Sequence, residues 1–341
     1  MLGRRWIRSA GTARVGITAL GILLTSTAIS ADAQDVARLS GDDVAIYNLA
    51  GRVEIVSGNG PDVVVRAARE GRDADRLAVE TGRIGGRETL RIVYPAAEVV
   101  YPEMGRGSTT TRTVRPDGTF SDGRSGSGDR VRIRGSGSGM EAWADLVIEV
   151  PAGRRIGVYL AVGGVEAHGV EGDMRIDTGS GRVTLSDIRG RVGVDTGSGS
   201  IEAERLSGGE VVLDTGSGSI TVQDVEAPSL WADTGSGSVR MRGVRSREVE
   251  VDTGSGSVEI ELLTDVERLL VDTGSGSVTV TVPADFGAEV EMETGSGRID
   301  VDLPVELRTV RRDELRGRIG DGGGTLSIDT GSGGIRLRSR G

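Results

Sequence analysis

The sequence of 341 residues contains no cysteine, no lysine, one histidine and only 3% aromatic residues. The absence of cysteine excludes disulfide bonds and a lipoprotein anchor, so an exported form of this chain must rely on a long packed core instead. All 41 basic residues are arginine, and 51 acidic residues give a formal net charge of −10. This acidic balance argues against nucleic acid and anionic lipid as partners.

The first 33 residues have the pattern of an export signal. A basic start, an apolar run and a small-x-small cleavage site follow one another, at Arg4, Arg5, Arg8 and Arg14, at Val15 to Ile29 and at Ala31 to Ala33. The apolar run is short for a membrane span, although an uncleaved anchor is the alternative. We therefore predict a signal peptide over 1–33 and an exported protein of the periplasm or the extracellular surface, without a membrane span after cleavage. Cleavage would change the net charge from −10 to −13, because the segment contains four Arg and one Asp.

A short motif, Asp-Thr-Gly-Ser-Gly, recurs through the second half of the chain. It begins at Asp177, Asp195, Asp214, Asp233, Asp252, Asp272 and Asp329, and a Glu-Thr-Gly-Ser-Gly copy begins at Glu293. The steps from Asp177 to Glu293 are 18, 19, 19, 19, 20 and 21 residues. The last step, 36 residues, is close to two periods and predicts a repeat that has lost its motif. A fixed period of about 20 residues is typical of a stacked array.

Apolar and polar residues alternate on both sides of the motif. Counted from the motif Asp as position zero, positions −3, −1, +6 and +8 are apolar in every copy, and position +7 is always polar. This period of two predicts a strand before the motif and another after it, each with one buried face.

One such unit cannot bury its apolar face alone, whereas identical units stacked on one another bury it in a continuous column. The pattern therefore predicts an all-β fold, a single-stranded parallel β-helix or solenoid with rungs of about 19 residues. Right-handed winding is the usual preference of parallel crossovers. Like residues of successive copies would form ladders with a spacing of about 4.8 Å. An antiparallel meander, with Gly-Ser-Gly as a hairpin turn, is the alternative.

Both glycines of the motif are present in all eight copies. Glycine reaches backbone conformations with positive φ, and it lets neighbouring backbones approach at a tight corner. We therefore predict structural corners at these positions. In the first six copies the corner glycines are Gly179, Gly181, Gly197, Gly199, Gly216, Gly218, Gly235, Gly237, Gly254, Gly256, Gly274 and Gly276.

Composition divides the rest of the chain. Residues 34–102 alternate as strands without the motif, and we expect further rungs or an N-terminal cap there. Residues 103–140 are rich in Gly, Ser, Thr and Arg and low in apolar residues, which predicts a flexible insertion. Residues 141–341 contain the repeats of the predicted solenoid domain, and within them the charged stretch Arg308 to Arg318 is expected to be a loop or short helix.

These features resemble a bacterial family of β-strand-repeat proteins of unknown function whose members are named as candidate adhesins. The resemblance lies in Asn48-Leu-Ala-Gly-Arg-Val-Glu-Ile55, in Val147-Ile-Glu-Val-Pro-Ala-Gly153, in the Thr-Gly-Ser-Gly rungs and in Gly317-Arg-Ile-Gly-Asp-Gly-Gly-Gly324. It covers most of the chain after the signal, except residues 103–140. The resemblance implies a single-stranded parallel β-solenoid, a location in the cell envelope and no established catalysis.

The ladder of motif carboxylates is a candidate cation site. Carboxylates stacked about 5 Å apart repel one another, and Ca²⁺ would relieve the repulsion. In the alternative, each Asp accepts hydrogen bonds from the backbone of its own corner. The candidate ligands are Asp177, Asp195, Asp214, Asp233, Asp252 and Asp272. No other cofactor is expected.

Trp231 is the candidate contact residue. It occupies position −2, which is predicted to face outward, with Val212 one rung below and Leu270 two rungs above. An exposed aromatic side chain with apolar neighbours can contact a sugar or a protein. In the alternative, a connection or the insertion folds over it.

No residue pattern indicates catalysis. Eight equivalent motif serines argue for architecture, because a nucleophilic serine needs a base beside it, and His168 is expected to be solvated. We therefore expect a non-enzymatic exported β-solenoid that acts as an adhesin-like or cell-envelope scaffold or binding protein. Its expected partner is an envelope protein or glycan, and it can also self-associate end to end. The alternatives are a carbohydrate-active lyase or glycosidase on the same fold, or a cation-stabilised surface repeat protein.

Overall fold

The computed structural model describes residues 34–121, 123 and 126–340. The predicted signal peptide, residues 1–33, lies outside them. The described residues form 27 strands and two short 3-10 turns, η1 (Ala74–Arg76) and η2 (Pro102–Met104). Most of the strands belong to one 23-stranded sheet, and four form a second sheet. The prediction of an all-β fold is confirmed, and the described part of the chain has no helix long and apolar enough to cross a membrane.

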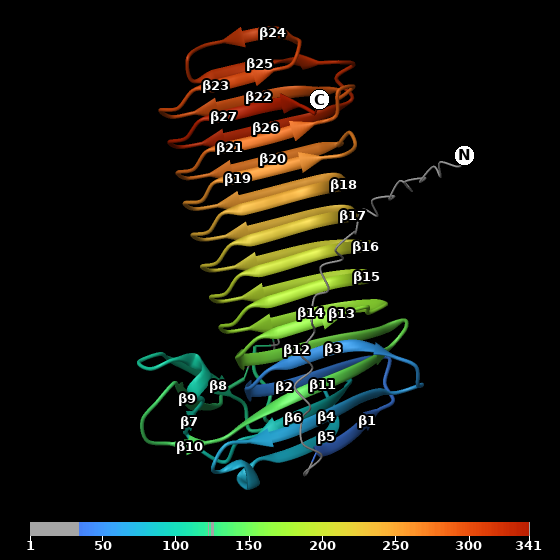
Figure 1. The fold of residues 1–341 in the computed structure, drawn as a ribbon, viewed down its shortest axis with the longest axis vertical. Coiled ribbons are helices and arrows are strands. Elements are labelled where there is room, and N and C mark those ends of the chain that lie inside the picture. Colours follow the sequence, from blue (N-terminus) through green and yellow to red (C-terminus); the bar gives the residue numbers. More distant parts are fainter. Residues whose placement is uncertain (1–33, 122, 124–125, 341) are drawn as a thin grey trace, which may run out of the picture. The chain divides into compact units, whose positions relative to one another are not determined.

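Successive repeats run parallel and in register, one beside the next (Figure 1). Asp195 lies opposite Asp214, Asp214 opposite Asp233, and Asp233 opposite Asp252. The predicted columns of like residues are therefore confirmed, and the antiparallel meander is wrong for the repeats. The strands of these coils are β14 (Gly172–Thr178), β15 (Val183–Thr196), β16 (Ile201–Thr215), β17 (Ile220–Thr234), β18 (Val239–Thr253), β19 (Val258–Leu262), β20 (Arg268–Thr273) and β21 (Val278–Val282).

The core is the column of inward-facing apolar residues. In the central coils, positions −3, −1, +6 and +8 are buried, as at Val211, Leu213, Ile220 and Val222. Full burial of one such side chain contributes about 1.5–3 kcal/mol. Each coil therefore depends on its neighbours, because its own residues supply only one layer of this column.

The motif glycines let adjacent coils approach closely at the corner. A Cβ on Gly237 would lie 1.8 Å from the carbonyl oxygen of Gly218 in the preceding coil, and one on Gly235 would lie 2.6 Å from that of Gly216. Among the predicted corner glycines, only Gly181 has a φ in the left-handed region, +144°. The predicted need for positive φ is thus limited to Gly181, and close approach explains the others.

Motif threonines connect the coils from inside the corner. Thr215 Oγ1 donates to the Gly199 carbonyl oxygen, and Thr234 Oγ1 donates to that of Gly218, both at 2.9 Å. Thr253, Thr273, Thr294 and Thr330 donate in the same way to glycines of neighbouring coils. The hydroxyls of Thr178 and Thr196 are buried and have no hydrogen-bond partner among the described residues.

At the C-terminal end, the order of the coils in space differs from their order in the chain. The last coil, β26 (Gly324–Thr330) and β27 (Ile335–Ser339), pairs on one side with β20 and β21. On its other side it pairs with β22 (Ala288–Thr294) and β23 (Ile299–Asp302). If each coil is named by its motif carboxylate, the Asp329 coil (β26 and β27) therefore lies between the Asp272 coil (β20 and β21) and the Glu293 coil (β22 and β23) (Figure 1).

The 36-residue step contains no hidden repeat, so this prediction is wrong. Its residues form an antiparallel hairpin, β24 (Val305–Val310) and β25 (Glu314–Ile319), and β25 pairs antiparallel with β22. The expected loop or short helix over Arg308 to Arg318 is also wrong. The physical reason is that the hairpin covers the edge that the Glu293 coil would otherwise leave open.

A coil without the motif begins the stack at its other end. Strands β2 (Asp43–Ala50) and β3 (Val53–Gly58) pair parallel with β12 (Arg154–Val162) and β13 (Val165–His168), which in turn pair with β14 and β15. Beyond it lie β6 (Arg87–Val93) beside β2 and β11 (Trp143–Pro151) beside β3. Antiparallel strands complete this end, namely β1 (Gln34–Leu39), β4 (Val63–Glu70) and β5 (Ala78–Ile84).

The second sheet includes much of the predicted flexible insertion, residues 103–140. Its strand order is β10 (Met140–Glu141), β7 (Glu98–Val100), β9 (Asp129–Arg134) and β8 (Thr109–Val114). Residues 103–140 thus contribute β8, β9 and the start of β10 to a regular sheet, and the flexibility expected of this insertion stays a prediction. Few apolar residues suffice, because Val131, Ile133 and Met140 are buried in the common core and threonines suit a strand.

The close approach at the corner predicts a strong difference between two glycines. Gly237→Ala should destabilise the fold by about 2–3 kcal/mol, because the backbone must move to admit the Cβ. Gly193→Ala is the matched control, because its Cβ would meet nothing within 4 Å. The control should leave stability unchanged or raise it by about 0.5 kcal/mol. Urea unfolding followed by circular dichroism measures both, and equal losses in the two variants would contradict the steric explanation.

The threonine column gives a second matched pair. Thr234→Val should cost about 1 kcal/mol, because it removes a buried hydrogen bond to the corner. Thr196→Val should cost nothing or stabilise the protein, because its hydroxyl is buried without a partner. Thermal unfolding of the two variants tests this, and a greater loss in Thr196→Val than in Thr234→Val would refute the assigned bonding.

Candidate functional site

A groove of about 400 Å³ opens on the outer face of the first repeats. Its floor includes Gly193, Val212 and Trp231, which lie opposite one another at position −2 of adjacent coils. Gly193 leaves the hollow, because it has no side chain and the space above its backbone is open. The structure thus brings Trp231 and Val212 into one site.

Leu270 lies outside this groove. Glu250 stands between Trp231 and Leu270 in the same column, because Trp231 is opposite Glu250 and Glu250 is opposite Leu270. The apolar patch that the sequence suggested is therefore interrupted by a charged side chain. It continues in the other direction, over Val212 to Gly193.

One side of the groove is formed by Asp195 and Asp214, two members of the predicted carboxylate ladder. Neither side chain makes a hydrogen bond or ion pair with any other described residue. The alternative expectation, that each Asp accepts hydrogen bonds from its own corner, is therefore not met at these two positions. Their oxygens remain available to a ligand.

The pKa of two ladder members, Asp214 and Asp252, is raised. Burial raises the pKa of Asp214, and the charges of Asp195 and Asp233 raise it further. The pKa of Asp252 is raised in the same way, by burial first and then by Asp233 and Asp272. The raised pKa is therefore not particular to the groove, because Asp252 shows it and does not line the groove.

All six candidate calcium ligands lie in register along this ladder, from Asp177 to Asp272. Across the described part of the chain, no group of three or more His, Cys, Asp or Glu residues is arranged to hold a metal ion. Calcium binding by the ladder stays a prediction.

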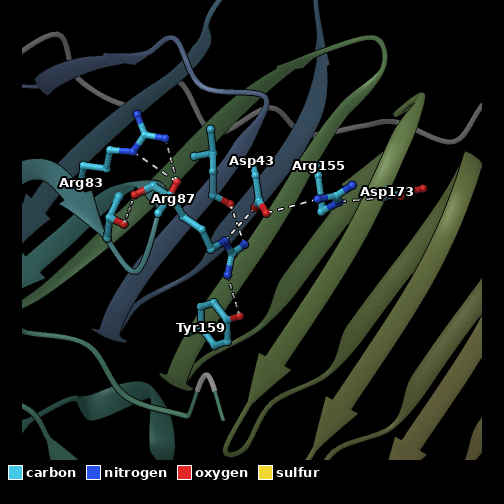
Figure 2. A network of polar contacts seen from close by, with 9 residues as sticks. Asp43, Arg83, Arg87, Arg155, Tyr159 and Asp173 are labelled. Atoms are coloured by element: carbon cyan, nitrogen blue, oxygen red, sulfur yellow. Dashed lines mark hydrogen bonds and ion pairs between the residues drawn. The ribbon is translucent and has the colours of Figure 1, made fainter. Parts of the chain in front are cut away.

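Arginines form the other side of the groove, and ion pairs hold most of them in place. Figure 2 shows Arg155 between two carboxylates, 3.4 Å from Asp43 and 4.0 Å from Asp173. Asp43 also accepts a hydrogen bond from Arg87, which donates to the Tyr159 hydroxyl at 3.1 Å.

Arg191 lines the same side, whereas Arg175 stands at the end of the floor row, opposite Gly193. Arg191 lies 3.9 Å from Glu210. Arg175 has no ion pair among the residues that the structure describes. The groove therefore combines an apolar floor, two free carboxylates and one free guanidinium.

His168 lies on another part of the surface, next to a serine and an aspartate. Its Nδ1 is 2.8 Å from Ser186 Oγ and 3.6 Å from Asp187 Oδ2. In a catalytic triad the two ring nitrogens face the nucleophile and the acid separately. Here both neighbours face one nitrogen, and the His168 side chain is 70% exposed. The arrangement is that of a solvated surface histidine.

Sequence reasoning found Trp231, Val212 and the acidic ladder but missed Gly193 and the arginine side. One available signal was that Gly193 is the only glycine at position −2 among the motif repeats. The arginine side could not be found in this way, because Asp43 and Arg87 come from elements far away in the chain.

Comparison with known proteins identifies a family for most of the chain. The model of the family described as Toastrack DUF4097 matches residues 127–338. No curated protein gives a significant match. A solved structure, a candidate cell adhesion protein from Clostridium sporogenes ATCC 15579, aligns at 11% identity over 90% of this chain and 99% of its own, with a TM-score of 0.23. At that TM-score the likeness carries no argument.

The ladder predicts a stability change that depends on pH. Asp214→Asn should raise Tm at pH 7 by about 1–2 °C, since a partly exposed, screened charge is worth only a fraction of a kcal/mol. The folded pKa of Asp214 is raised above its ordinary value of 3.8. The charged form therefore costs stability above the folded pKa, and this cost disappears as pH falls below 3.8.

The matched control has the opposite sign. A hydrogen bond from Arg240 holds the pKa of Glu259 below its ordinary value of 4.5, so Glu259→Gln should destabilise the protein at pH 7, and this loss should shrink as the pH falls from 4.5 through the folded pKa. Thermal melts of both variants at pH 3 and pH 7 check the two directions. A lower Tm of Asp214→Asn at pH 7 would show that other interactions of this carboxylate outweigh the repulsion within the ladder.

Proposed function

The chain belongs to the Toastrack DUF4097 family, and from this premise we propose that it is an exported, adhesin-like binding protein of the cell envelope without catalytic activity. The function of this family is unknown. Membership therefore supports the β-repeat architecture, and the function has to be argued from the candidate site. Export is supported by the pattern of residues 1–33. As for the fold, we propose a right-handed solenoid with about 19 residues per coil.

The observation that carries the proposal is the groove at Gly193. Positions −3, −1 and +1 of the central coils are buried and nearly uniform, so they serve the stack. Position −2 faces outward and changes from coil to coil, with Arg175, Gly193, Val212 and Trp231 in successive copies. A rigid column with variable outward side chains is suited to recognition, because the scaffold holds each contact in a defined place.

The open edges at the two ends suit self-association less well. Exposed apolar side chains occur there, Val36 on β1 and Leu307 and Val310 on β24. The pairing of β24 with β25 is interrupted by an irregularity between Leu307 and Thr309. Such irregularities, together with flanking charges, usually protect an edge from pairing with another chain. We therefore favour an envelope glycan or protein as the partner over a second copy.

A glycosidase is the second candidate function. Asp195 and Asp214 lie side by side in the groove, and the raised pKa of Asp214 resembles that of a general acid. However, catalytic carboxylates of glycosidases flank the bond that they cleave, whereas these two project from one column. The pKa of Asp252, outside the groove, is raised as well. Binding therefore ranks ahead of hydrolysis.

The proposed function predicts binding without turnover. Purified residues 34–341, immobilised on a sensor, should bind at least one component of an array of envelope glycans and solubilised envelope proteins. Val212→Arg should abolish this binding because it fills the groove, and Thr221→Arg, at an outward position of another column, should leave it intact. Mass spectrometry of the bound component should show no cleavage product. Absence of any binder, or appearance of a product, would contradict the proposal.

A further inference from the structure

The floor of the groove is apolar along the stacking direction. Gly193, Val212 and Trp231 follow one another on adjacent coils, and the open space over Gly193 exposes this row to a ligand. An indole ring beside aliphatic surface is suited to the C–H face of a sugar ring, which is apolar although its edge is polar. The row therefore provides a platform for a flat, amphipathic ring.

The acidic side of the groove provides acceptors at matching positions. A carboxylate can accept about four hydrogen bonds, and those of Asp195 and Asp214 accept none from the described residues. Neighbouring hydroxyls of a sugar are paired donors that suit the paired oxygens of a carboxylate. A ligand rich in O–H groups would satisfy both side chains at once.

The spacing of the coils fits a chain of sugars. Adjacent parallel strands lie about 4.8 Å apart, which is close to the length of one pyranose unit in an extended oligosaccharide. Successive rings can therefore meet successive coils, each with one floor residue and one carboxylate. Each sugar ring would therefore meet the same two outward positions, the floor residue at −2 and the motif carboxylate, on its own coil.

The charges in the groove select against acidic sugars. Asp195 and Asp214 belong to a ladder of carboxylates that extends on both sides of them. Arg155 and Arg191 already face carboxylates of this chain, at Asp43, Asp173 and Glu210. Arg175 is one unpaired guanidinium beside the two unpaired carboxylates, so the unpaired charge of the groove is still net negative. Anions would be repelled by the ladder, while hydroxyl or ammonium donors would be attracted.

We propose that the groove binds a non-acidic oligosaccharide, with sugar rings along Gly193, Val212 and Trp231. Its hydroxyl or ammonium groups donate to Asp195 and Asp214. This inference rests on the proposed function and names the ligand class for the same site.

The experiment is calorimetric titration of residues 34–341 with three hexasaccharides of equal length. These are a β-1,4-linked glucosamine oligomer, its N-acetylated form and an oligogalacturonate. We expect binding of one or both non-acidic oligomers and at least tenfold weaker binding of the oligogalacturonate. Trp231→Ala and Asp214→Asn should each weaken binding about tenfold.

Matched controls come from the same columns. Leu270→Ala and Asp252→Asn occupy equivalent positions outside the groove and should leave affinity within about twofold of the parent. Gly193→Leu should block binding while retaining the circular dichroism spectrum, because its side chain extends into open space. In residues 34–341 with Trp143→Phe, Trp231 is the one remaining tryptophan. Its fluorescence should therefore change when the sugar binds.

Three results would overturn the inference. They are tighter binding of the oligogalacturonate, unchanged affinity in folded Trp231→Ala, and failure of both non-acidic oligomers to bind. If Val212→Arg still abolishes capture of an envelope component that is not a saccharide, the inference fails and the proposed function stands. If nothing binds in either experiment, both fail.

Discussion

At the Gly-Ser-Gly corner, the carbonyl oxygen of one coil occupies the space that a Cβ of the next coil would need. This close approach sets the register of the whole stack. It brings Thr234 Oγ1 within 2.9 Å of the Gly218 carbonyl oxygen and places apolar side chains directly over their counterparts. Any larger residue at the second glycine would separate two coils at once, so that the loss would extend to both neighbouring layers of the core.

The same register that builds the core also produces the candidate site. Stacking places Asp195 beside Asp214, where burial and mutual repulsion raise the pKa of Asp214. Burial of the apolar column outweighs this repulsion in the free energy of folding. In the neighbouring outward column, position −2 changes identity from Gly193 to Val212 to Trp231, and the missing side chain at Gly193 creates a hollow on an otherwise regular face. Structure and recognition are therefore divided between alternate residues of the same strands.

The ends of the stack follow different rules from its middle. A coil has two partners inside the array, but a terminal coil leaves a row of unpaired backbone groups. The chain resolves this with antiparallel strands, β25 against β22 at one end and β4 against β11 at the other. At the N-terminal end of the carboxylate column, a tyrosine takes the place of the motif aspartate. Tyr159 lies opposite Asp177, and its ring stacks on that of Tyr47 at 4.6 Å.

The sequence by itself determined the strands of the motif repeats, their buried faces, their parallel columns and the outward position of Trp231. It could do so because each of these depends on a short period, and the same local pattern recurs in copy after copy. Tertiary structure alone decided that the Asp329 coil lies between the Asp272 and Glu293 coils, and that Asp43 holds Arg155 at the groove. All coils present nearly the same edge, so local pattern cannot specify which coil follows which. That choice depends on contacts between residues far apart in the chain, which bury the last open edges.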